Sequence, residues 1–144
     1  MIAVDTNVLV YAHRKEAAEH DVAKARLLGL GAQTRQWAIP WPCIYEFLGV
    51  VTNVRIWKAA ATPPASAWAQ VSVWLKSPSL RMLSETESTP EILERMLSSG
   101  RVRGPVVHDA RIAALCLAHG VETLLSRDRD FSLFPELNVE NPFA

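Results

Sequence analysis

Short apolar runs alternate with longer helical stripes from one end of the chain to the other. The first run, Ile2–Val4, ends at Asp5 and is expected to form a buried strand. Further strands are expected at Trp37–Ile39, Leu80–Leu83 and Leu124–Leu125, with an edge strand at 137–139. Strands that alternate with helices form parallel sheets covered on both faces, so the pattern predicts an α/β fold.

Six segments between the strands carry helical stripes or helix-start signals. They are residues 7–13, residues 16–30, the stripe Ile44, Phe47, Leu48 and Val51, and three helices opened by Thr62-Pro63-Pro64, Thr89-Pro90 and Pro105. Gly29 and Gly31 are expected to end the second of these helices. In the helix opened by the proline pair, Trp68, Val71 and Leu75 are expected to face the core.

The composition describes one ordinary globular domain. The chain has 144 residues and 49% of them are hydrophobic, so a single domain over residues 1–144 is expected to fold without metals or disulfides. Cys43 and Cys116 lie in apolar stretches, which favours reduced core cysteines. No basic leader precedes Asp5 and no apolar run could cross a bilayer, so a soluble cytoplasmic protein is expected. A formal net charge of zero argues against nucleic-acid binding by bulk charge alone.

Four carboxylates stand where such a sheet binds ligands, beyond the carboxyl ends of its strands. Asp5 follows the first strand, and a helix N-cap is an equally good interpretation of it. Glu46 is the only charged residue between 41 and 54, and it needs a partner or a proton unless it reaches water. Asp109 begins a helix, where it also complements the helix dipole. Asp128 lies in the charged loop after Leu125, where a solvated turn is the alternative.

Taken together, the four acids favour a cation site. Crowded carboxylates repel one another and persist only with bound cations, and all-oxygen ligands select the hard ions Mg²⁺ or Mn²⁺. The sequence has no Cys/His set for zinc and no glycine-rich phosphate loop. Such a cation activates water and clamps the oxygens of an in-line displacement, so metal-dependent phosphoryl chemistry is expected.

Four motifs resemble those of the PIN-domain ribonucleases, in the order of that family and over nearly the whole chain. They are Val4-Asp5-Thr6-Asn7-Val8-Leu9, Tyr45-Glu46-Phe47-Leu48, His108-Asp109-Ala110-Arg111-Ile112-Ala113-Ala114 and Leu125-Ser126-Arg127-Asp128-Arg129-Asp130-Phe131. The last motif, continued to Phe143, is similar to the closing motif of VapC-type toxins. Ser126 replaces the commoner Thr, and Gly49 stands where an Arg is more familiar. Residues 58–104 match no motif.

The resemblance implies a three-layer α/β/α sandwich with a parallel sheet of four to five strands, and the toxin of a toxin–antitoxin pair. It implies an endoribonuclease that uses Mg²⁺ or Mn²⁺ and leaves a 5′-phosphate and a 3′-hydroxyl. It also implies a homodimer and neutralisation by a cognate VapB-type antitoxin. Carried over by position, the catalytic and metal-binding acids are Asp5, Glu46, Asp109 and Asp128.

Other residues of the motifs are expected to assist these acids. Thr6, Asn7 and Ser126 would support the metal site. Asp130 stands directly before Phe131 and is expected to cap the following turn, while Asp128 serves as the ligand. Contacts to RNA are expected from four basic side chains: Arg127, Arg129, Arg111 and His108.

Two other functions fit the same residues. A Mg²⁺-dependent phosphatase or phosphotransferase would use Asp5 as a covalent nucleophile, but such enzymes usually carry a second acid where this chain has Asn7. A covalent phospho-aspartate would identify that enzyme. A catalytically silent PIN-like module would bind RNA or a partner without cleavage, and the intact set of acids argues against it.

Overall fold

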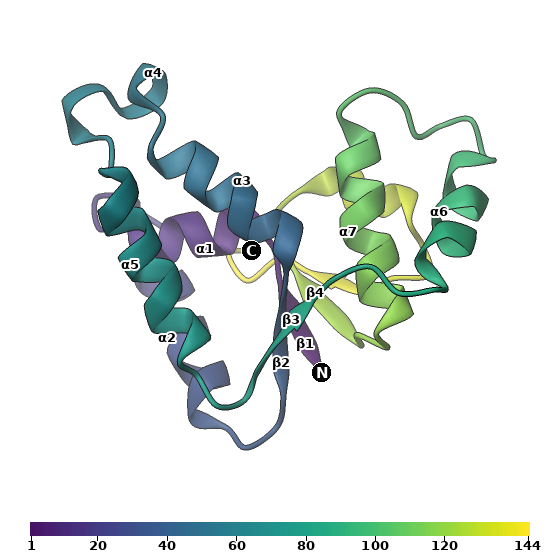
Figure 1. Cartoon of the computed structure of the whole chain (residues 1–144), viewed down its shortest axis with the longest axis horizontal. Coiled ribbons are helices and arrows are strands. Elements are labelled where there is room, and N and C mark those ends of the chain that lie inside the picture. The colour runs from purple at the N-terminus through teal and green to yellow at the C-terminus, as the bar shows by residue number, and fades with distance from the viewer.

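A five-stranded parallel sheet runs through the middle of the computed structural model, which describes residues 1–144 (Figure 1). The strand order is β3-β2-β1-β4-β5, and every pairing is parallel. The strands are β1 (Ile2–Val4), β2 (Trp37–Pro40), β3 (Leu80–Leu83), β4 (Thr123–Leu125) and β5 (Val139–Glu140). The predicted α/β fold with four to five parallel strands is confirmed, and only β5 starts later than expected.

Helices cover both faces of this sheet. They are α1 (Thr6–His13), α2 (His20–Ala32), α3 (Trp41–Val51), α4 (Val54–Trp57), α5 (Pro64–Leu75), α6 (Thr89–Leu97) and α7 (Val106–Ala118), with 3-10 turns η1 (Lys58–Ala60) and η2 (Arg129–Leu133). Figure 1 shows α1, α2 and α5 on one side of the sheet and α6 and α7 on the other, which is the predicted three-layer sandwich. None of these helices has the length and apolar character that crossing a membrane requires.

The expected end of the second helix is wrong. Gly29 and Gly31 both lie inside α2, which continues to Ala32. A glycine ends a helix when it adopts a positive φ, and the glycines that do so here are Gly100, Gly104 and Gly120. The helical conformation of Gly29 and Gly31 therefore costs some stability but does not interrupt the hydrogen-bond ladder.

The expected core face of α5 is also wrong in part. Val71 is buried as predicted, but its buried neighbours are Ala67 and Trp74. Trp68 is 48% exposed, whereas the ring of Trp74 packs edge-on against Phe47 with 4.9 Å between centroids. Apolar residues occupy both sides of α5, so the packing partner decides which side is buried.

The strand order places a crevice between β1 and β4. The chain runs outward from β1 through β2 to β3, and then returns to the other side of β1 for β4 and β5. Ligands bind at such a reversal of strand order, beyond the carboxyl ends of the strands. Asp5 follows β1 directly and Ser126 follows β4, so the first and last motifs meet at this point.

Candidate active site

Asp5 is buried at the carboxyl end of β1, and four donors surround its carboxylate. It is only 5% exposed. Its Oδ1 accepts hydrogen bonds from the Thr6 backbone N–H at 2.8 Å and from the Cys43 thiol at 3.5 Å. Its Oδ2 accepts from the Ser126 hydroxyl at 2.7 Å and from the Asn7 amide at 3.2 Å. Asp5 also occupies the N-cap position of α1, so its interpretation as a helix cap is confirmed and its role in binding a metal stays a prediction.

Glu46 lies on the exposed side of α3, close to the start of α1. Its Oε2 accepts a hydrogen bond from the Thr6 hydroxyl at 2.9 Å, which fixes the orientation of the carboxylate. The supporting role expected of Thr6 stays a prediction, and this contact is the one through which its hydroxyl would act. Glu46 is exposed, so water solvates its charge. It is the only charged residue in its segment of the sequence, but it is not buried.

Three other carboxylates form a cluster beside these two. Asp109 lies in the first turn of α7, and Asp128 and Asp130 lie in the loop after β4. Each of the three offers a carboxylate oxygen, and these oxygens lie within 4.8 Å of one another. Asp130 is therefore placed by the fold beside the acids that the motifs predicted, although it was expected to act as a cap.

The cap of η2 is Asp128, and the expectation that Asp130 caps this turn is wrong. Asp128 is the N-cap residue, and its Oδ1 accepts the Asp130 backbone N–H at 2.9 Å. The Asp128 N–H in turn donates to the Ser126 hydroxyl at 3.0 Å. These local bonds hold the loop against the Asp5 network and leave the exposed Asp130 carboxylate free of protein partners.

Crowding and burial make the negative charges unfavourable in the protein alone. Burial raises the pKa of Asp109, and the charges of Asp128, Asp5, Asp130 and Glu46 raise it further, to about 7. Burial also raises the pKa of Asp5, against the hydrogen bonds from Ser126, Thr6 and Cys43 that favour its charged form. The site therefore has an excess of negative charge that the chain itself does not neutralise.

The acids line a hollow of about 570 Å³ at the carboxyl end of the sheet. Glu46, Asp109, Asp128 and Asp130 contribute to its wall. The remaining lining residues come from α3 and α7 and the residues before α7: Pro42, Tyr45, Pro105, His108, Arg111 and Ile112. The hollow is open to solvent and large enough for a phosphate group with its neighbouring sugar.

Of the four side chains expected to contact RNA, two are held by hydrogen bonds or ion pairs within the chain and two are not. Arg111 lines the acidic hollow but is held by Glu85, with 2.6 Å between Nε and Oε1. Arg127 donates to the Tyr11 hydroxyl at 2.9 Å and lies 3.4 Å from Glu19. Arg129 and His108 are exposed, and neither makes a side-chain hydrogen bond or an ion pair. The contacts to RNA stay predictions, and these two side chains are the ones free to make them.

Cys43 is the site residue that sequence reasoning missed. It was predicted to be a reduced core cysteine, and it is fully buried as expected. Its thiol nevertheless points at Asp5, and burial together with the Asp5 charge raises the pKa of this thiol, so it stays protonated and can donate. Cys43 is buried whereas Glu46, three residues later, is exposed, so the sequence carries no signal that places this thiol beside Asp5.

Known proteins are similar to this chain over nearly its whole length. The family model described as PIN domain matches residues 2–137. This chain is 33% identical to ribonuclease VapC43 of Mycobacterium tuberculosis over 142 residues, covering 99% of this chain and 95% of that protein. The chain belongs to the PIN domain family of VapC ribonucleases. It is also 30% identical to ribonuclease VapC37 of the same organism, over 100% of this chain and 99% of that protein.

Solved structures of the same kind share the fold of this PIN domain. VapBC-1 from nontypeable Haemophilus influenzae aligns with a TM-score of 0.71 and 14% identity over 100% of both chains. VapBC2 from Rickettsia felis, bound to a DNA fragment from its promoter, aligns with a TM-score of 0.68 and 21% identity over 98% of both chains. At these identities the likeness establishes the architecture, and the chemistry rests on the residues of this chain.

Substitutions in the closing loop of this PIN domain should separate the cap from the acid cluster. Asp128→Ala should lower the free energy of unfolding by about 1 kcal/mol because the Asp130 N–H loses its acceptor. Asp128→Asn keeps the cap and Asp130→Ala removes none, so neither should lower that free energy. All three should lower RNA cleavage by roughly tenfold or more, since each removes a charge from the cluster.

Urea denaturation and initial cleavage rates of the three variants measure the two effects independently. Equal destabilisation by Asp128→Ala and Asp130→Ala would contradict the assigned cap. Cleavage by Asp130→Ala at the wild-type rate would remove Asp130 from the cluster that acts on RNA.

Proposed function

We propose that this chain is a divalent-metal-dependent endoribonuclease, the toxin of a toxin–antitoxin pair. The observation that carries the proposal is the group of carboxylates at the crevice between β1 and β4, which the chain does not neutralise. The similarity to VapC ribonucleases over 99% of the chain supports RNA as the substrate class.

The donor set suits a hard divalent cation. Every candidate ligand is a carboxylate oxygen, and the cluster contains no imidazole or thiolate. Two oxygens on opposite sides of a Mg²⁺ ion lie about 4.2 Å apart, since each Mg–O bond is about 2.1 Å. The oxygens of Asp109, Asp128 and Asp130 already lie within 4.8 Å of one another, so small side-chain rotations suffice.

The proposed ligands are Asp5, Asp109 and Asp128, with Glu46 and Asp130 at the edge of the set. The proposed ion is Mg²⁺ or Mn²⁺, because both accept oxygen ligands in octahedral geometry. When bound, the cation activates water and stabilises charge on the phosphodiester oxygens. Asp5 has no free lone pair, so in holding a cation it gives up a protein hydrogen bond, and the 3.5 Å contact from Cys43 is the weakest.

The surrounding residues of the chain orient these acids. The Ser126 hydroxyl and the Asn7 amide hold Oδ2 of Asp5, and Asn7 also donates to the Ser126 oxygen at 3.0 Å. The Thr6 hydroxyl fixes one oxygen of Glu46, which leaves the other without a protein partner and able to bind water or the substrate. Orientation by such outer contacts is what keeps a set of ligands ready for its cation.

The covalent phosphotransferase is the weaker alternative. A nucleophilic carboxylate needs an oxygen that can approach the phosphorus atom, but both oxygens of Asp5 accept two hydrogen bonds in a buried position. The residue at the place of a second acid, Asn7, is committed to the same network. A silent binding module is disfavoured because Glu46, Asp109 and Asp128 line one hollow and the Asp5 charge acts on Asp109.

The solved neighbours and the acidic hollow both support an antitoxin as the protein partner of this chain. The solved neighbours are complexes of a VapC toxin with its VapB antitoxin, and a VapB-type antitoxin is the partner proposed for this chain. An acidic hollow of about 570 Å³ is complementary to a basic side chain, so the antitoxin is expected to insert a Lys or Arg among the carboxylates.

We also propose a homodimer formed through α3 and α5. Trp68 is 48% exposed and lines a shallow hollow with Leu48, Gly49 and Thr52, which share one face of α3. Apolar surface of this kind marks an interface. Light scattering at micromolar concentration should give twice the 16.0 kDa of the chain, and Trp68→Glu should give the monomer. A wild-type monomer, or a dimer undisturbed by Trp68→Glu, would contradict this interface.

Withdrawal and return of the metal test the proposed reaction. The purified chain should cleave single-stranded RNA in Mg²⁺ or Mn²⁺, stop in EDTA and resume when the ion is added back in excess. The products should carry 5′-phosphates, because water attacks the phosphorus and the 3′-oxygen leaves. Cleavage undiminished in EDTA, or products with 2′,3′-cyclic phosphates, would exclude this mechanism.

A further inference from the structure

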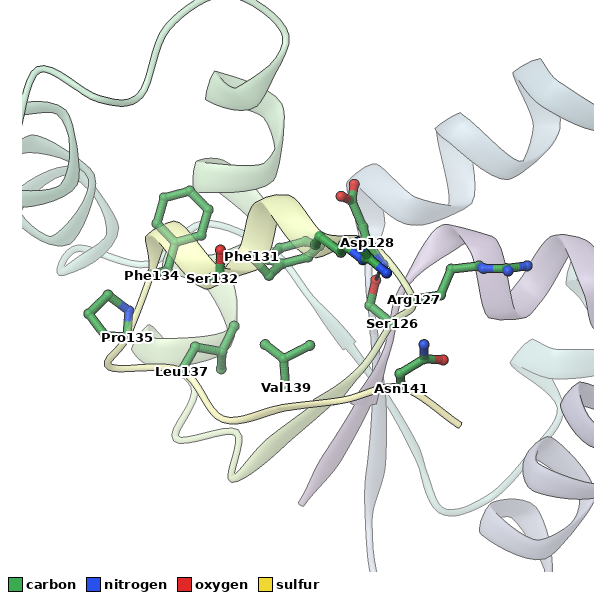
Figure 2. A pocket seen from close by; sticks show the side chains of 11 residues that line it. Ser126, Arg127, Asp128, Phe131, Ser132, Phe134, Pro135, Leu137, Val139 and Asn141 are labelled. Carbon is green, nitrogen blue, oxygen red and sulfur yellow. Dashed lines mark hydrogen bonds between the residues drawn. The ribbon is translucent and has the colours of Figure 1, made fainter. Parts of the chain in front are cut away.

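A second hollow of about 510 Å³ lies behind the active-site loop, between η2 and β5. Figure 2 shows Phe131, Leu137 and Val139 around its floor. Phe131 is 1% exposed and Leu137 is 5% exposed, so they form a packed layer beneath the hollow, and the partly exposed Val139 and the exposed Pro135 present its apolar surface. The volume falls within the range of about 300–1,000 Å³ that small-molecule sites occupy.

The rim of this hollow carries polar groups with unused hydrogen-bonding capacity. Arg129 and Ser132 are exposed and make no side-chain hydrogen bond within the chain. Asn141 accepts the Phe143 backbone N–H through Oδ1 at 2.9 Å, which leaves both hydrogens of its amide free. A planar apolar ligand with hydrogen-bonding edges would satisfy these groups while covering the floor.

The second hollow adjoins the acidic site, because one residue lines both. Asp128 lines both the acidic hollow and this second one. Figure 2 shows Ser126 and Asp128 at one end of the second hollow and Pro135 at the other. A chain bound across the acidic cluster therefore has the second hollow as its neighbour on the η2 side.

We propose that this second hollow binds the base of an unpaired nucleotide next to the phosphodiester that is cleaved. The inference rests on the proposed ribonuclease function and adds to it a site that selects sequence. An apolar floor, an unpaired arginine and free amide hydrogens are what single-stranded RNA requires of a base site. A protein strand is the poorer occupant, since β5 has only two residues with which to pair it.

Two variants change the hollow without touching the acids. Ser132→Trp fills it from the rim, and Asn141→Asp keeps the acceptor for the Phe143 N–H but removes the amide hydrogens. Thr34→Trp is the control, because Thr34 is exposed before β2, at the opposite end of the strands. The probe is a random-sequence single-stranded RNA, with the cut positions read by sequencing the new 5′ ends.

The wild type should prefer one base at a position beside the cut, and both variants should reduce that preference by roughly tenfold. Thr34→Trp should keep it. An unchanged preference in both variants would overturn the proposal. Weaker antitoxin binding with an unchanged cutting preference would also overturn it, and would assign the hollow to the antitoxin.

A binding measurement keeps the proposal testable apart from cleavage. Millimolar AMP, GMP, CMP or UMP in EDTA should shift the backbone amide NMR signals of residues 129–141 for at least one base, and Ser132→Trp should abolish the shift. If the nucleotides shift these signals but the protein does not cleave RNA, the result would count against the ribonuclease function and would still support the base site. Absence of any shift in this segment would overturn the base site, whatever the outcome of cleavage.

Discussion

Asp5→Asn should abolish RNA cleavage while the protein stays folded. Asp5 is the one acid at the crevice whose carboxylate is held on both oxygens, by Thr6 and Cys43 on Oδ1 and by Ser126 and Asn7 on Oδ2. The substitution removes a negative charge from the proposed cation site. Loss of an outer partner alone costs roughly 10–100-fold in metal sites, so loss of a ligand should cost at least about 100-fold in cleavage.

The fold should survive because the opposing effects are similar in size. The Asn carbonyl can still accept the Thr6 N–H and cap α1. Its NH₂ group would face the Asn7 amide, also a donor, and an unsatisfied buried group costs about 1–3 kcal/mol. Against this, the substitution removes a buried charge that burial already disfavours, as the raised pKa of Asp5 indicates.

Initial rates on labelled RNA and thermal melting measure the two effects together. Asp21→Asn is the control, because Asp21 is an exposed acid in the first turn of α2 and lies outside the four motifs. The control should cleave at the wild-type rate. A folded Asp5→Asn that cleaves as fast as the wild type would exclude Asp5 from the chemistry.

Asp109→Asn should also stop cleavage, yet it should stabilise the metal-free protein above neutral pH. The pKa of Asp109 is raised to about 7 in the folded state, whereas an aspartate in an unfolded chain titrates near ~3.9. Between these values the folded protein holds a proton that the unfolded chain has lost. Raising the pH through this window therefore lowers the contribution of Asp109 to the free energy of unfolding, and the loss is complete above pH 7.

Asn at position 109 cannot ionise, so it removes this pH dependence. In EDTA, the wild type should melt at a lower temperature at pH 8 than at pH 5.5, and Asp109→Asn should melt above the wild type at pH 8. Mg²⁺ should raise the melting temperature of the wild type at pH 8, because a ligand of the folded state stabilises it, and should raise that of the variant less.

Asp21→Asn is again the matched control, since Asp21 and Asp109 both lie in the first turn of a 13-residue helix. A first-turn acid ordinarily stabilises its helix by about 0.3–1 kcal/mol, so Asp21→Asn should lower the melting temperature slightly or leave it unchanged. Destabilisation by Asp109→Asn at pH 8 would mean that Asp109 acts as an ordinary helix acid outside a crowded cluster.

The sequence predicts the places of the acids better than their local roles. Apolar runs ended by polar residues locate β1 and β4, and parallel strands bring the residues after them to one edge, so Asp5 and Asp128 are predicted correctly to lie there. Asp128 and Asp130 stand only two residues apart. Which of them caps η2 depends on the turn that the backbone takes, and the pattern of residue types does not encode that turn.

Packing between distant segments decides the other differences. Trp68 and Trp74 are six residues apart on a helix with apolar residues on both sides, and the contact of Trp74 with Phe47 selects the buried side. Arg127 was expected to contact RNA, but the fold brings Tyr11 and Glu19 to its guanidinium. For the two tryptophans and for Arg127, the residue type can be read from the sequence. The side chains that they contact come from distant segments and are known only from the fold.

RNA cleavage by the cluster around Asp5 should leave new RNA ends in cells. Wild type and Asp5→Asn would be induced briefly at equal levels, and the new 5′-phosphate ends in total RNA would be sequenced. A small set of recurrent new ends is expected with the wild type, and none of them with Asp5→Asn. The same ends in both samples, or no new ends with a folded wild type, would contradict cleavage by this cluster.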